Sequence, residues 1–128
     1  MADLLKTGSD WLEGMRVAHA SMTVEYYREL NYVELKATPG ETTFEVDTGQ
    51  GTIERIESRD FLILAADLIL LGMVTLPQRG DQIKEPIGAG GTELVYEVMS
   101  PGDGPPWRYS DNYRKTLRVH TKLVGTEP

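Results

Sequence analysis

The stretch Leu76-Pro77-Gln78-Arg79-Gly80-Asp81-Gln82-Ile83 decides the fold class of this 128-residue chain. Pro77 has a fixed φ and no backbone N–H, so it suits the entry to a strand rather than its middle. Gly80 can adopt a positive φ, and the carboxylate of Asp81 can accept hydrogen bonds from nearby backbone amides. The stretch therefore predicts a tight turn that leads into a short strand. Leu94-Val95-Tyr96-Glu97-Val98 alternates apolar and polar residues and predicts a second strand.

A period of two residues recurs on both sides of this stretch and predicts further strands. Residues 21–27 and 33–37 are expected to form an antiparallel hairpin, which Thr38-Pro39-Gly40 should end. Ile53 and Ile56 are three residues apart, so their strand either contains a bulge or changes faces. The chain should contain about six or seven short strands, the last of them around Leu117, Val119 and Leu123, which alternate with Arg118, His120 and Lys122.

The apolar run from Phe61 to Leu64 predicts a strand that is buried on both sides, followed by one helical turn from Ala65 to Leu68. Helical spacing also fits this run, and periodicity alone does not decide between the two. Two segments rich in glycine and proline, Glu85–Gly91 and Ser100–Pro106, are predicted as loops, the second of them stiff and exposed.

Residues 3–19 are predicted as an amphipathic helix, because Leu4, Trp11 and Met15 fall on one apolar stripe. Such a short helix is marginal alone in water and must dock, either on its own sheet or on a neighbouring subunit. We therefore expect a helical segment at residues 1–20 and a β-barrel domain at residues 21–128. The predicted fold class is mainly β: a small β-barrel, or sandwich-like barrel, of about six to seven strands with one N-terminal α-helix.

Composition limits the class of function. The net charge of −7 argues against a general nucleic-acid binder, because a negative field repels the phosphate backbone. The absence of cysteine excludes disulfides, thiolate metal sites and cysteine nucleophiles. The longest apolar run, from Phe61 to Val74, is interrupted by Asp67 and is too short to span a bilayer. No signal-peptide pattern opens the chain, so a soluble protein is expected.

The sequence offers almost no catalytic chemistry. His19 and His120 belong to no metal-binding spacing and are expected on the surface. Pairs such as Asp60 and Asp67 arise by chance among 20 acidic residues. The segment Gly88–Thr92 lacks the Lys-Ser/Thr ending of a P-loop and is predicted as a hairpin loop. We therefore expect no enzyme, no catalytic residue, no cofactor and no metal.

The strongest remaining constellation is a group of aromatic and basic side chains near the C-terminus: Trp107, Arg108, Tyr109, Tyr113, Arg114, Arg118 and Lys122. Aromatic rings interleaved with arginine can stack on single-stranded bases. The same residue types are enriched at protein interfaces. A third interpretation is a solvated strand face whose aromatic rings hold the proline-rich loop.

The pattern Pro77-x-x-Gly80-Asp81-x-Ile83, followed by Tyr96-Glu97-Val98, is shared with a family of small phage proteins. The first hairpin, Asp60-Phe61-Leu62-Ile63 and the closing strand Leu117–Lys122 extend the likeness over most of the chain from about residue 21. On these features the chain resembles the tailed-bacteriophage head–tail connector proteins of the head-closure, or stopper, type. The family-like motif residues are Pro77, Gly80, Asp81, Ile83, Tyr96 and Val98.

The resemblance implies a homo-oligomeric ring of six or twelve subunits in the virion neck, assembled in the host cytoplasm and away from membranes. One side of the ring would bind the portal or adaptor and the other the tail-terminator or tail tube protein, while packaged DNA passes through the lumen without sequence-specific binding. Expected contact residues are Leu4, Trp11, Met15, Trp107, Arg108, Arg114 and Arg118. Two alternatives remain open: a tail-completion (tail terminator) protein of the same neck, and a small ligand-binding or hydrolytic β-barrel.

Overall fold

The computed structural model describes residues 21–88, 90–102 and 104–127, and the protein there is mainly β. Nine strands follow one another along the chain: β1 (Met22–Arg28), β2 (Asn31–Asp47), β3 (Ile53–Leu64), β4 (Ile69–Leu70), β5 (Met73–Val74), β6 (Gln82–Ile87), β7 (Thr92–Val98), β8 (Trp107–Tyr109) and β9 (Thr116–Glu127). A 3₁₀ helix, η1 (Ala65–Asp67), follows β3 and confirms the predicted helical turn. The prediction of a mainly β fold is therefore confirmed, whereas the predicted helix at residues 3–19 lies outside the described residues.

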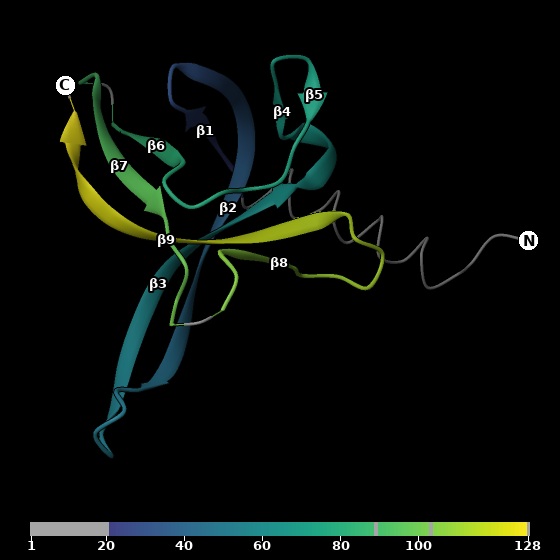
Figure 1. Ribbon diagram of the computed structural model, residues 1–128. Coiled ribbons are helices and arrows are strands. Elements are labelled where there is room, and N and C mark those ends of the chain that lie inside the picture. The colour runs from purple at the N-terminus through teal and green to yellow at the C-terminus, as the bar shows by residue number, and fades with distance from the viewer. Residues whose placement is uncertain (1–20, 89, 103, 128) are drawn as a thin grey trace, which may run out of the picture.

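The main sheet has seven strands in the order β3-β2-β1-β6-β7-β9-β8, and β3 pairs with β9 as well. Because of that extra pairing, the path from β3 through β2, β1, β6, β7 and β9 returns to β3. Strands β4 and β5 form a separate two-stranded hairpin (Figure 1). Within the described ranges, no helix is long and apolar enough to cross a membrane.

The side chains that point inward from these strands form the hydrophobic core. Its fully buried members include Tyr26, Phe61, Ile63, Ile83 and Leu117. Phe61 and Ile63 are enclosed, but Leu62 and Leu64, which alternate with them, are only half-buried, so β3 has one core face here rather than two. Burying such side chains is the main driving force for folding.

The predicted end of the first hairpin at Thr38-Pro39-Gly40 is wrong. Strand β2 continues to Asp47, because β3 pairs with it without a break from Ala37↔Ile63 to Asp47↔Ile53. Strand β1 leaves β2 at Ala37, so Pro39 lies where β2 has one neighbouring strand, a place where proline is tolerated. The unbroken register also shows that no bulge separates Ile53 from Ile56.

The outer halves of β2 and β3 extend beyond the other strands as a two-stranded arm, residues 41–58, that projects from the sheet (Figure 1). It turns at Gly49-Gln50-Gly51, with positive φ at Gly49 and Gly51.

Three further differences concern later strands. The predicted loop at Glu85–Gly91 is shorter than expected, since β6 continues through Pro86 and pairs with β7 up to Ile87↔Thr92. Strand β8, which follows the proline-rich loop and pairs with β9, was not predicted from the sequence. Leu123 on β9 is 56% exposed, although it lies opposite the buried Tyr96 of β7. The pairing of β7 with β9 shifts register just beyond it, between Val95 and Tyr96.

The turn at Gly80 offers a direct test of the fold. The amide of Asp81 donates to the carbonyl of Gln78 at 3.1 Å, and Gly80 has φ +92° in the third position of this turn. That position of a type II turn requires a positive φ. A Cβ added at Gly80 would meet nothing within 4 Å, so only the backbone conformation opposes substitution. We expect Gly80→Ala to lower the free energy of unfolding by ~1–2 kcal/mol.

Urea unfolding of the purified chain measures this effect. Gly80→Asn should cost less, because asparagine tolerates a positive φ better than alanine does. Gly125→Ala is the matched control, since its Cβ also meets nothing and no positive φ is involved. Equal stability of Gly80→Ala and the control would contradict the turn.

Candidate functional site

Asp81 is the centre of a buried polar network that fixes the Leu76–Asp81 segment on β1. The guanidinium of Arg28 donates to both carboxylate oxygens, Nε to Oδ1 at 3.1 Å and Nη2 to Oδ2 at 2.8 Å. The hydroxyl of Tyr26 and the amide of Gln78 donate to Oδ2 at 2.5 and 3.0 Å. Burial, together with the bond to Asp81, raises the pKa of Tyr26 far above its ordinary value. The phenol therefore stays a donor to the carboxylate.

The same arginine holds the rest of the segment. Arg28 also donates to Thr75 Oγ1 at 3.0 Å and to the carbonyl of Leu76 at 2.7 Å. Backbone bonds join the turn to the end of β7, with Gly80 N donating to Val98 O at 3.0 Å and Val98 N donating to Asp81 O at 2.7 Å. This network gives the motif around Asp81 a structural role.

All six family-like motif residues have a structural role in the fold. Pro77 is buried, Gly80 forms the turn, and Asp81 anchors it. The other three lie in the core, at 0%, 7% and 1% exposure: Ile83, Tyr96 and Val98. The structure thus brings the motif together as one packed unit formed by β6, β7 and the turn that precedes β6.

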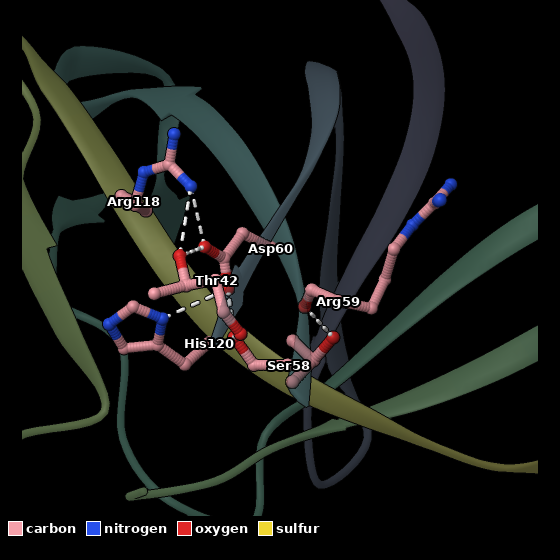
Figure 2. A network of polar contacts seen from close by, with 7 residues as sticks. Thr42, Ser58, Arg59, Asp60, Arg118 and His120 are labelled. Atoms are coloured by element: carbon pink, nitrogen blue, oxygen red, sulfur yellow. Dashed lines mark hydrogen bonds and ion pairs between the residues drawn. The ribbon is translucent and has the colours of Figure 1, made fainter. Parts of the chain in front are cut away.

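A second network surrounds Asp60 on β3, where β2, β3 and β9 lie side by side (Figure 2). Oδ1 of this fully buried carboxylate accepts from Ser58 Oγ at 2.5 Å and lies 2.9 Å from His120 Nδ1. Oδ2 accepts from Arg118 Nη1 at 2.6 Å and from the hydroxyl of Thr42. Burial alone would raise the pKa of Asp60, but the hydrogen bonds from His120, Ser58, Thr42 and Arg118 outweigh it and hold that pKa well below its usual range.

The burial of His120, which is 2% exposed, corrects the prediction of a surface histidine. Alternation along β9 places His120 among the polar residues of that strand. However, Asp60 lies directly opposite His120 on β3, and the ring of Phe44 packs edge-on against the imidazole, with 4.9 Å between the ring centres. Alternation in a sequence shows which residues share one face of a strand, but not which other strand pairs with it.

The serine, histidine and aspartate of this network do not form a nucleophilic triad. A triad needs the imidazole between the hydroxyl and the carboxylate. Here Ser58 and His120 both bond to Asp60, so the hydroxyl has no base to activate it. Each of the three residues is at most 2% exposed, although Ser58 and His120 also line surface pockets. The network is a structural clamp between strands.

No metal site appears in the described ranges, where no group of three His, Asp or Glu side chains could hold an ion. The pair considered in the sequence, Asp60 and Asp67, is split between the buried network and the turn of η1.

The surface carries two features that could contact other proteins. The first is the β4–β5 hairpin, whose exposed apolar side chains are Ile69, Leu71, Met73 and Val74. The second is a groove of about 420 Å³ between the two-stranded arm and the proline-rich loop. Apolar side chains that line this groove include Phe44, Val46, Pro101 and Trp107.

The expected contact residues near the C-terminus take different positions. Arg108 and Arg114 are exposed and stay available to a partner, with the guanidinium of Arg114 5.7 Å from the centre of the Tyr109 ring. Trp107 is half-buried and packs against the core, and Arg118 is bound to Asp60. The other three expected contact residues lie outside the described part of the chain: Leu4, Trp11 and Met15.

Sequence reasoning missed the β4–β5 hairpin because it treated Phe61–Val74 as one apolar run. A usable signal was present: no charged residue occurs from Leu68 to Gln78, and Leu71-Gly72 interrupts that stretch with a glycine. A glycine between two short apolar segments is a hairpin signal.

The Asp60 clamp predicts how stability depends on pH. Because the pKa of Asp60 is lowered by folding, its contribution is complete above the ordinary value of 3.8 and is lost as the pH falls from there through the folded value. Asp60→Asn should lower the free energy of unfolding at pH 7 by about 3 kcal/mol, because it leaves buried donors without a charged acceptor. The difference in the free energy of unfolding between Asp60→Asn and the parent chain should be smaller at pH 3 than at pH 7.

Urea unfolding at pH 7 and pH 3 measures both values. Glu54→Gln, which removes one negative charge from the exposed arm, is the control and should change stability little at either pH. If Asp60→Asn lowered the free energy of unfolding by the same amount at both pH values, this would contradict the role of ionised Asp60 as the centre of the clamp.

The chain matches the family model described as phage head-tail joining protein over residues 2–128. No curated protein shows significant similarity to the chain. The matched range contains the Asp81 and Asp60 networks, the hairpin and the arm. The chain therefore belongs to the phage head-tail joining proteins.

Proposed function

We propose that this chain forms a ring in the phage neck, between the portal or adaptor and the tail, where it closes the filled head and provides the attachment surface for the tail. The observation that carries the proposal is the family match over residues 2–128, which includes every described strand. A structural role of this kind also fits the two polar networks, which are used to hold strands together rather than to react.

The architecture supports a ring subunit. The closed cycle of strand pairings, which we take to be a small barrel, makes a rigid body with few free strand edges. The arm and the β4–β5 hairpin project from different ends of that body (Figure 1). A subunit in a ring contacts a neighbour on each side through two different surfaces, and these two projections meet that need.

The charge of the chain supports a DNA conduit. A net charge of −7 per subunit, repeated around a ring of six or twelve copies, gives a negative assembly. Phosphates are repelled by such a surface, so DNA would pass through the lumen without sticking to it. We place the assembled ring in the virion neck and its assembly in the host cytoplasm.

A phage that lacks this gene tests the proposal. Electron microscopy of lysates should show separate heads and tails of normal length, with heads that fail to retain their DNA. Supplying the chain from a plasmid should restore joined, infectious particles. Glu34→Gln should restore them equally well, because it changes only an exposed charge outside the arm and the β4–β5 hairpin.

Two outcomes would contradict the proposal. Tails of uncontrolled length would indicate a tail terminator rather than a head-closure ring. Normal joined particles in the absence of the chain would exclude a neck role altogether.

A further inference from the structure

The β4–β5 hairpin brings several exposed apolar side chains together. Leu71, Met73 and Val74 are 81%, 71% and 63% exposed. They lie within Leu68–Gln78, a stretch without any charged residue in a chain with net charge −7. An exposed apolar patch of this kind marks a contact surface in soluble proteins.

The backbone at the tip of the hairpin gives a second, independent indication. Leu71 has φ +55° and Gly72 has φ +77°. A two-residue turn with two positive φ values favours Asn-Gly, because a leucine at positive φ is strained. The strain at Leu71 costs stability in the isolated chain, and its exposed side chain gains no burial there to offset that cost. Such strain persists at sites where function requires it.

The groove along the arm has the shape and lining to receive such a tip. Its volume is about 420 Å³, and Phe44, Val46, Pro101 and Trp107 give it apolar walls. The charged side chains of Glu45, Asp47 and Arg108 also line it. The groove belongs to the arm end of the molecule, whereas the hairpin projects elsewhere (Figure 1). A contact between them therefore pairs two different surfaces, the kind of contact that can join successive copies head to tail.

We propose that the Leu71 tip of one copy inserts into the arm groove of the next copy, and that this contact, repeated around the ring, joins the subunits. The inference rests on the proposed ring. A contact between two different surfaces of identical chains produces a ring when the rotation closes. Two copies that each carry a charge of −7 repel each other, and an uncharged tip allows approach with the least repulsion.

Cysteine cross-linking tests the contact, since the chain has no cysteine of its own. The double variant carries Leu71→Cys at the tip and Pro105→Cys, an exposed residue that lines the groove. Particles assembled in infected cells with this variant are oxidised and separated on a non-reducing gel. We expect a ladder of covalent multimers that ends at a closed ring and disappears on reduction.

The matched control replaces the groove cysteine by Pro86→Cys, an exposed proline on β6 that does not line the groove. It should give no ladder. Cross-linking by Leu71→Cys alone, or by the control as strongly as by the double variant, would overturn the inference. Particles that contain the chain but show no ladder would overturn the inference and leave the proposed function standing. Particles without the chain would overturn the proposed function and the inference with it.

Leu71→Asn separates assembly from folding. Asparagine followed by Gly72 suits this turn better than leucine does, so the melting temperature of the isolated chain should be unchanged or higher. The same variant should lose the ability to restore joined particles, because the polar tip no longer fills the apolar groove. Full complementation by Leu71→Asn would overturn the inference.

Discussion

The carboxylate of Asp60 holds three strands together at the place where the sheet closes on itself. It lies on β3 directly opposite His120 of β9 and takes hydrogen bonds from Thr42 of β2 and Arg118 of β9. A buried charge is costly unless charged and polar partners surround it. Here the partners come from strands that are far apart in the chain, so the carboxylate is satisfied only when β2, β3 and β9 are all in register. The closure of the sheet and the direction in which the arm leaves it both depend on that condition.

The family motif and the contact surfaces divide the molecule between folding and assembly. Asp81, Ile83 and Tyr96 lie inside the domain and maintain one rigid packing of β6, β7 and the preceding turn. The β4–β5 hairpin and the arm lie outside that packed unit. The motif accounts for the interior of the domain, and the proposed contacts with neighbours use projecting segments that the motif does not include.

Much of the fold could be predicted because its signals are local. The β1–β2 hairpin follows from strict alternation, and the turn at Gly80 follows from a glycine placed where φ is positive. The errors came from pairings between distant segments. Pro39 did not end β2, because β3 supports it from across the arm, and His120 is buried because Asp60 lies opposite it. The exposed hairpin at Leu71 was missed because apolar residues predict burial, and no single chain shows what covers them in an assembly.

A subunit that joins two larger assemblies must stay soluble and separate until it reaches them. The net charge of −7 favours separation by repulsion between copies, and at physiological ionic strength this repulsion extends about 8 Å from the surface. The proposed apolar contact between Leu71 and the arm groove acts only when two surfaces touch. Repulsion would therefore dominate at low concentration in solution. Binding of each subunit to the head would offset the repulsion by holding copies side by side, where the effective concentration is high. If the chain forms the proposed ring, this argument favours assembly on the head rather than in solution, because the short-range contact would exceed the repulsion only where copies are held side by side.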